Sequence, residues 1–209
     1  SLVFKNELGF SIGFNFIIVP ASVSTLGKSS PKGINMTITK ESEEKLFNRC
    51  VVNNSAYDYY TRCSEEDLNI LAPPSDLRIW IFHNIVPSST LMMHHGAIIS
   101  SGVLKIFIGK ADFIVALFAP DLTIGLKGRE DYSSIYDSVT HELAHASHFR
   151  KVGKTYWNSY IKYILESYVK SGDMYGKGDG EYAGICEVGE MWAYYLESKM
   201  YKDRYGGGF

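Results

Sequence analysis

The sequence predicts an α+β fold, and three observations support that class. The chain has 209 residues, of which 45% are hydrophobic and 21% charged, enough apolar material to bury one sizeable core. Short β-branched and aromatic runs lie between residues 77 and 126, and helical periodicity begins only after Gly128. Strands first and helices later, without regular alternation, favour α+β over a doubly wound sheet. We therefore expect one domain over residues 1–209, mainly sheet-forming at 1–128 and helical at 129–209.

The first part of the chain is expected to contain a loop, a helical stretch and four strands. Residues 22–33 are rich in Ser, Gly and Pro and indicate a loop, whereas residues 40–49 carry a helical charge pattern. A helix cannot continue through Pro73 and Pro74. The candidate strands that follow are Leu77–Phe82, Gly96–Ile99, Val103–Ile108 and Leu122–Leu126. Together they predict a small mixed or antiparallel sheet.

Three helices are expected after Gly128. In the first, from Asp131 to about Val152, apolar residues recur every three or four positions, and Asp131 or Ser133 can cap it. A second helix covers residues 156–170, and a third runs from about residue 185 to residue 200. Residues 171–184 between them hold five glycines and therefore predict a loop.

Charge and hydropathy argue against two kinds of partner. The formal net charge is -2, and scattered Lys and Arg residues leave no basic stripe for nucleic acid. The longest apolar run, residues 14–19, is far shorter than the roughly 20 residues of a membrane-spanning helix. We expect neither a nucleic-acid partner nor a transmembrane segment in this chain.

The ends of the chain and its cysteines bear on export. The chain begins at Ser1 instead of Met and stops abruptly at Phe209, so we expect a piece of a longer protein whose signal segment is absent. Cys50 and Cys63 can form a disulfide that leaves Cys186 unpaired, although three buried thiols are an equal alternative. We expect an exported protein, extracellular, at the cell surface or periplasmic.

The most informative motif is HExxH, formed by residues 141–145 within the first of these helices. Positions four apart lie about 40° apart on a helix, so His141 and His145 can both face one metal ion. Glu142 is rotated by about 100° from His141 and lies beside such an ion, where a general base for water belongs. A zinc hydrolase needs a third protein ligand as well. Acidic residues of the last helix, Glu187 and Glu190, are the candidates, on a face opposite Val188, Trp192 and Tyr195.

These residues resemble the zincin metallopeptidases, specifically the gluzincins, in which HExxH is followed by a Glu ligand on a later helix. The segment Glu190-Met191-Trp192-Ala193-Tyr194 is similar to the segment of gluzincin aminopeptidases that carries this Glu. The resemblance implies a zincin-like fold with one Zn²⁺ per chain, bound by His141, His145 and Glu190, and Glu142 as the base. Glu187 remains an alternative ligand.

The chain also departs from the family. The 44 residues between His145 and Glu190 are more than thermolysin-like members have, and Tyr194 stands where those enzymes place an Asp that supports a histidine. His148 lies about 10 Å along the helix from His141, too far to share an ion. It is either a group at the rim of the site, paired with Glu187, or a surface histidine.

The resemblance extends to substrate binding. Zincin substrates lie along an edge strand ahead of the HExxH helix, a position that residues 121–126 occupy here. A tyrosine commonly helps the metal to stabilise the oxyanion, and Tyr182, Tyr194 and Tyr195 are the candidates by nearness in sequence. The glycine-rich residues 172–180 form either a lid or a simple surface connection.

These observations predict a zinc-dependent metallopeptidase that hydrolyses peptide bonds in a peptide or protein substrate, with Glu142 as general base. Two alternatives stay open, because HExxH determines the metal chemistry and not the substrate. One is a zincin-like module that binds protein or glycan without turnover. The other is a zinc hydrolase of a non-peptide amide.

Overall fold

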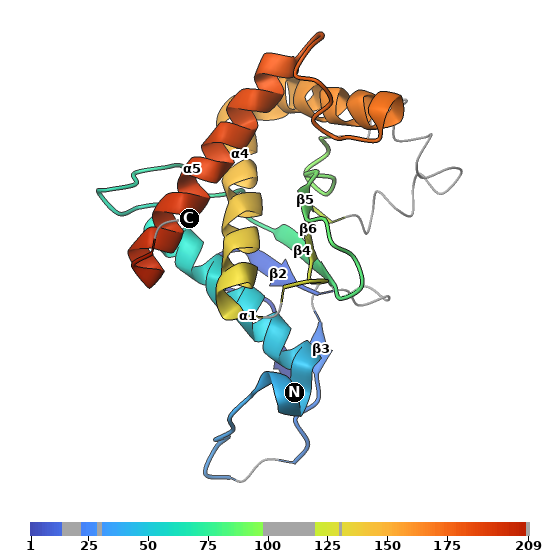
Figure 1. Ribbon diagram of the computed structural model, residues 1–209. Helices are drawn as coiled ribbons and strands as arrows, with labels where there is room; N and C mark the ends of the chain where they lie inside the picture. Colours follow the sequence, from blue (N-terminus) through green and yellow to red (C-terminus); the bar gives the residue numbers. More distant parts are fainter. Residues whose placement is uncertain (14–21, 29–30, 98–119, 130, 208–209) are drawn as a thin grey trace.

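The computed structural model describes residues 1–13, 22–28, 31–97, 120–129 and 131–207 (Figure 1). Three helices and two small sheets confirm the predicted α+β class. The helices are α1 (Lys40–Arg62), α4 (Tyr132–Ser171) and α5 (Ala183–Tyr205). The strands are β1 (Leu2–Val3), β2 (Phe10–Ile12), β3 (Val23–Ser24), β4 (Leu77–Phe82), β5 (Ser89–Thr90) and β6 (Leu122–Gly125). None of these helices is long and apolar enough to cross a lipid bilayer.

The larger sheet has the strand order β2-β4-β6-β5, and β1 pairs with β3 in a separate two-stranded sheet. β2 and β6 run parallel to β4, whereas β5 runs antiparallel to β6, so the sheet is mixed as predicted. The expectation that residues 121–126 form the edge strand is wrong, because β6 lies between β4 and β5. Leu122, Ile124 and Gly125 are buried, as expected of an internal strand. Among the described strands, β5 is the edge on the side of the HExxH helix.

The structure confirms one of the other predicted strands and contradicts the start of another. Leu77–Phe82 is confirmed as β4. Gly96 and Ala97 lie in a turn and a bend instead of a strand, and the rest of that candidate, with residues 103–108, lies outside the described residues. The short strands β2 and β5 were not predicted. Gly125 is needed where β5 approaches, because a Cβ there would lie 2.5 Å from the carbonyl oxygen of Pro87.

The helix α1 extends well beyond the helical pattern at residues 40–49. It begins at Thr39, whose side chain accepts a hydrogen bond from the backbone of Ser42 in a capping box, and it ends at Cys63. Cys50 and Cys63 are both free, which excludes the disulfide and leaves the alternative of unpaired thiols. The reason is geometric: thirteen residues of one helix separate them, which is about 20 Å along its axis. The cysteines therefore give no support to export.

The helix α4 contains the first two predicted helices, joined at a sharp corner. Asp131 caps its start by accepting a hydrogen bond from the backbone of Ser134 at 2.7 Å, as predicted. At Gly153 the backbone turns to φ 79° and ψ 172°, a conformation essentially restricted to glycine. The corner divides α4 into a first arm before Gly153 and a second arm after it, which run in clearly different directions (Figure 1).

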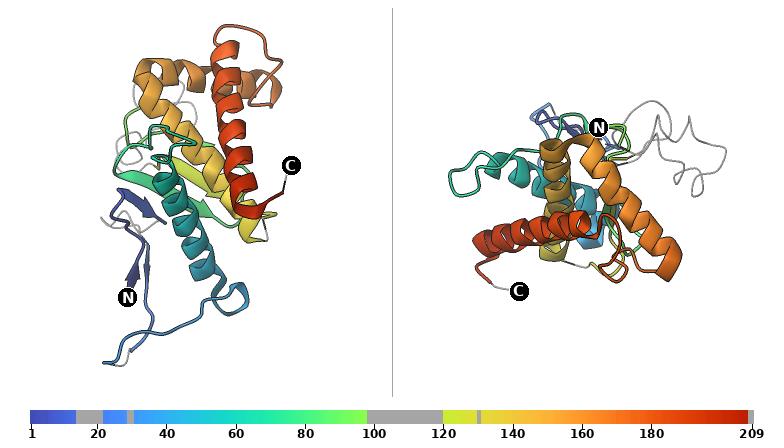
Figure 2. Two further views of the ribbon diagram at one scale, coloured as in Figure 1. Left: turned by 90° about the vertical axis from the view of Figure 1, so that its left-hand side faces the viewer. Right: turned by 90° about the horizontal axis from the view of Figure 1, so that it is seen from above.

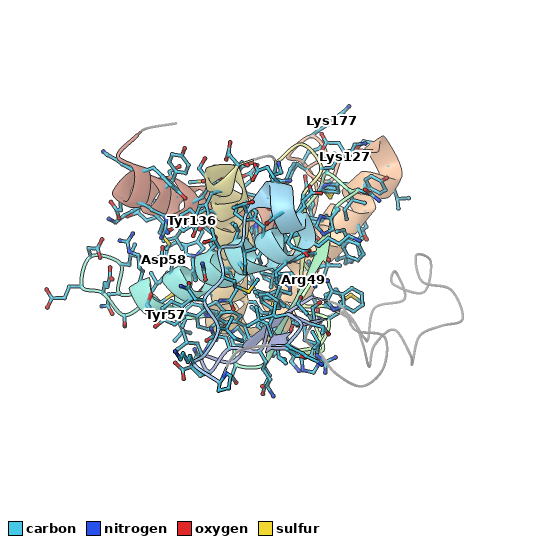
Figure 3. The ribbon with its side chains drawn as sticks, turned by 90° about the horizontal axis from the view of Figure 1, so that it is seen from below. Arg49, Tyr57, Asp58, Lys127, Tyr136 and Lys177 are labelled. Carbon is cyan, nitrogen blue, oxygen red and sulfur yellow. The ribbon has the colours of Figure 1, made fainter. Side chains whose placement is uncertain are left out.

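The first arm of α4 lies between the sheet and α5 (Figures 1 and 2). On its α1 side, Tyr136 donates a hydrogen bond of 2.6 Å to Asp58, and Figure 3 labels both residues on adjoining helices. The apolar residues Val188 and Tyr195 do not belong to the face of α5 that meets α4, since both are more than half exposed. The buried residues of α5 are Ala183, Cys186, Gly189, Glu190, Ala193, Leu196 and Met200.

Gly189 explains why this face of α5 packs against α4. A Cβ at this position would lie 3.0 Å from the ring of Tyr160 in the second arm of α4. The absence of a side chain lets the two helices approach closely, and this approach buries the neighbouring Glu190 between them. A carboxylate buried at a helix contact needs strong partners, and these partners form the candidate site.

Candidate metal centre

Three side chains from two helices converge beside this contact. His141 and His145 project from one face of the first arm of α4, and Glu190 projects from α5. One nitrogen from each histidine and one carboxylate oxygen of Glu190 all lie within 4.8 Å of one another. Among the described residues, this is the group of His, Cys, Asp and Glu side chains arranged to hold a metal ion. We call these three residues the triad.

The spacing of the triad fits a tetrahedral zinc ion. The Nε2 atoms of His141 and His145 lie 3.1 Å apart, and each lies 3.5 Å from an oxygen of Glu190. Zinc binds nitrogen and oxygen at about 2.0–2.2 Å, so two ligand atoms of a tetrahedral site lie about 3.3–3.6 Å apart. The three distances are close to that range, and three protein ligands leave one coordination position for water or substrate.

Glu197 orients His141. Its Oε2 lies 2.8 Å from Nδ1 of His141 and accepts a hydrogen bond from it, so that Nε2 is the nitrogen that faces the other two residues of the triad. This carboxylate lies seven residues beyond Glu190 on the same helix. It supplies the support that Tyr194, at the position of the thermolysin-type Asp, does not. On the other histidine, Nδ1 of His145 is buried and has no hydrogen-bond partner in the described part of the chain.

Two tyrosines hold the carboxylate of Glu190. Tyr160, in the second arm of α4, donates a buried hydrogen bond of 2.6 Å to Oε1, and the hydroxyl of Tyr175 lies 3.4 Å from Oε2. Burial opposes ionisation of Glu190, but hydrogen bonds from His141 and His145 outweigh it and hold the pKa of Glu190 well below its usual range. The carboxylate is therefore charged and fixed, as a metal ligand must be.

The acidic surroundings also affect His141. Burial lowers its affinity for a proton, but hydrogen bonds to Glu190 and Glu197 outweigh that effect and raise its pKa to about 10. The cause is a surplus of negative charge around one imidazole. The same surplus favours a divalent cation between the histidines and Glu190, since the cation replaces the proton as the compensating charge.

Glu142 lies beside the triad, and a residue of the sheet holds its side chain in place. Its side chain is 6% exposed, and its Oε2 lies 2.7 Å from Oγ1 of Thr90 in β5. The same hydroxyl donates to the backbone oxygen of Glu142 at 2.8 Å. Burial raises the pKa of Glu142, as suits a carboxylate that takes up and releases a proton. Sequence reasoning gave no sign of Thr90, because β5 has only two residues.

Among the tyrosines predicted to stabilise an oxyanion, only Tyr194 adjoins the triad. Its ring packs edge-on against His141, with centroids 4.8 Å apart. Tyr195 is 57% exposed and packs against Trp192, and Tyr182 precedes α5 with its ring under Lys162. Tyr160 and Tyr175, which bond to Glu190, were not predicted.

The remaining two candidates lie apart from the ligand atoms. Glu187 is exposed, and its Oε1 lies near Gly178, 3.2 Å from where a Cβ would stand. His148 is buried and packs edge-on against Tyr156 and Trp157. The two are thus not paired with each other, and His148 is not a surface histidine. Burial lowers the pKa of His148, so it is neutral at pH 7.

Comparison with known proteins does not name a family. No protein-family model matches the chain, and neither the curated proteins nor the solved structures gave a match.

Proposed function

We propose that the chain is a zinc-dependent peptidase of gluzincin type. The observation that carries the proposal is the convergence of His141, His145 and Glu190 at a spacing suited to tetrahedral zinc, with Glu142 beside them. The residues that would hold Zn²⁺ are these three. A zinc ion bound there supplies Lewis acidity, which makes water nucleophilic near neutral pH and polarises a carbonyl group.

In this proposal Glu142 moves the proton. It takes a proton from the attacking water as a carboxylate and passes it to the departing amine of the substrate, so the carboxylate is regenerated in each cycle. Thr90 positions Glu142 through the bond of 2.7 Å to Oε2 and also bonds its backbone oxygen. A base anchored to both a strand and a helix keeps its distance to the substrate constant.

The described edge of the sheet supports a peptide as the substrate. β5 pairs with β6 on one side and is the outermost described strand on the other, and Thr90 connects it directly to Glu142. An extended peptide added to this edge would run past the triad. Tyr175 and Tyr194 lie on the side of α5 and the glycine-rich loop, where a hydroxyl can donate to the carbonyl oxygen under attack.

The test is incubation of the zinc-loaded chain with a mixed peptide library, with and without a chelator, together with a measurement of bound metal. We expect one zinc per chain and cleavage that the chelator abolishes and added zinc restores. Zinc binding without cleavage of any peptide would contradict the peptidase and favour the binding module. Cleavage only of non-peptide amides would favour the third possibility.

A further inference from the structure

A pocket opens beside Glu190 of the triad. Its volume is about 460 Å³, and its walls include Tyr163, Tyr175, Tyr194, Glu187 and Glu190. Glu190 belongs to both the pocket and the triad, so the two are continuous. The volume is within the range of sites that bind small ligands. A peptide bond placed at the triad can therefore direct one neighbouring side chain into this pocket.

The wall opposite α5 is built by the glycine-rich loop. The hydroxyl of Tyr163 donates to the backbone oxygen of Tyr175 at 2.8 Å, which ties the loop to the second arm of α4. Gly176 has φ 58°, and a Cβ there would lie 2.9 Å from Oγ of Ser167. The close approach requires glycine, and it positions the ring of Tyr175 along the pocket.

Charge in the pocket is negative. Glu187 lines it with an exposed carboxylate near Gly178, whereas the carboxylate of Glu190 is bound to Tyr160 and the two histidines. No Lys, Arg or His side chain is among the described residues that line the pocket. Lys177, between the two glycines of the wall, is exposed and extends outward at the edge of the molecule (Figure 3). Glu187 is therefore available to a cation from a ligand.

The aromatic walls suit the rest of a basic side chain. Lys and Arg bury their apolar stems along such surfaces while the charged group stays at a polar rim, and a cation over a tyrosine ring gains further attraction. An acidic side chain would instead meet the exposed carboxylate of Glu187 with like charge. We infer that this pocket selects a Lys or Arg side chain adjacent to the scissile bond, with its cationic group paired with Glu187. The position next to a scissile bond rests on the proposed peptidase function, whereas the selectivity of the pocket does not.

Two measurements test the inference on zinc-loaded protein. The first is kcat/KM for a peptide series that differs at one position on either side of the cleaved bond, carrying Lys, norleucine or Glu. Norleucine keeps the stem of Lys and lacks the amine, so the ratio of Lys to norleucine isolates the charge. The second is the affinity of the same peptides, by calorimetry, for the Glu142→Gln variant, which does not depend on turnover.

We expect the wild type to favour Lys over norleucine about fivefold, the range of a partly exposed ion pair. Glu187→Gln should reduce that ratio to about one, and Glu187→Lys should shift the preference to the Glu peptide. Glu181 is an exposed glutamate just before α5 that does not line the pocket. Glu181→Gln is therefore the matched control and should keep the wild-type ratio of Lys to norleucine.

A Lys-to-norleucine ratio that is equal in the wild type and Glu187→Gln would overturn the inference, even if peptides are cleaved. Conversely, absence of cleavage together with Lys-selective binding that Glu187→Gln removes would overturn the peptidase function and support the pocket. The two proposals therefore fail separately.

Discussion

Tyr160 donates a hydrogen bond of 2.6 Å to Oε1 of Glu190, and both residues are buried. The tyrosine comes from the second arm of α4, beyond the corner at Gly153, and the glutamate comes from α5. This bond joins the part of the helix that carries no motif to the ligand that completes the triad. It makes the second arm a structural part of the candidate metal site.

Removal of this hydroxyl should weaken metal binding. Tyr160→Phe keeps the ring stacked on Trp157 but leaves Oε1 of Glu190 without its shortest partner. Loss of such a supporting bond typically lowers zinc affinity about 10–100-fold. Competition with a chromogenic chelator measures the zinc Kd. Tyr57→Phe, at an exposed residue of α1 labelled in Figure 3, is the control, and an equal loss in both variants would contradict the role of Tyr160.

Glu197 should matter for zinc affinity through His141. Glu197→Gln retains an oxygen for Nδ1 but removes the negative charge that strengthens the imidazole as a ligand, so we expect a roughly tenfold weaker zinc Kd. Glu66→Gln, at an exposed residue, should leave the Kd unchanged. Unchanged affinity in Glu197→Gln would mean that the bond of 2.8 Å does not act on the metal.

Glu142→Gln separates metal binding from proton transfer. The side chain of Glu142 bonds to Thr90 and is not part of the triad, so zinc content should stay at the wild-type level. Turnover of a cleaved peptide should fall about 10²–10⁴-fold, the usual contribution of a general base. Zinc content by elemental analysis and kcat by a quenched-fluorescence assay check the two parts. Retained zinc with full activity would remove Glu142 from the mechanism.

A pH effect on stability is expected from His95 and Asp121, away from the triad. The side chain of Asp121 is fully buried, and its Oδ1 lies 2.9 Å from Nδ1 of His95. Burial opposes protonation of His95, but the hydrogen bond to Asp121 and its charge outweigh it and raise the pKa of His95. The folded state then binds the proton more tightly than the unfolded state. The stabilisation is complete below about pH 6.5 and is lost as the pH rises through the folded pKa.

Urea unfolding from about pH 5.5 to pH 8.5 measures this effect in the wild type and Asp121→Asn. We expect the variant to be about 3 kcal/mol less stable at the acidic end, because Asn removes the negative charge that pairs with protonated His95 and keeps only one of the two oxygens that accept hydrogen bonds from backbone N–H groups. The difference in unfolding free energy between the wild type and the variant should become smaller as the pH rises. Contributions of the nearby His94 and Asp76 largely cancel between the two proteins. If the stability difference between the two proteins stayed constant with pH, Asp121 would not raise the pKa of His95.

Periodicity and turn chemistry predicted much of the helical half. The cap at Asp131, the extent of the first helix and the glycine-rich loop follow from local sequence and are found as expected. The apolar pattern of α5 did not reveal its buried residues, because several of them, among them Gly189 and Ala193, are small and carry little hydrophobic signal. Helices pack closely through small residues, and a hydrophobicity pattern does not register that closeness.

The residues that support the site could not be predicted from local sequence, for a different reason. Thr90 lies on a strand of two residues, too short to show alternation. Tyr160 and Tyr175 reach Glu190 only because of a corner and a tied loop, which are long-range features. Glu197 differs from these residues, because it lies seven positions, about two helical turns, beyond Glu190 on the same helix, a spacing that places both on one face.

The corner at Gly153 has a stereochemical consequence. On a straight helix, His145 and Tyr160 would lie about 22 Å apart along the axis, yet their ring centroids are 5.7 Å apart. The fold-back depends on φ 79° and ψ 172°, a conformation that an L-amino acid disfavours and its mirror image accepts. Alanine at this position should strain the site in its natural L form, whereas D-alanine introduced by chemical ligation should preserve it. Completion of the candidate metal centre thus depends on an achiral residue that touches none of the triad residues.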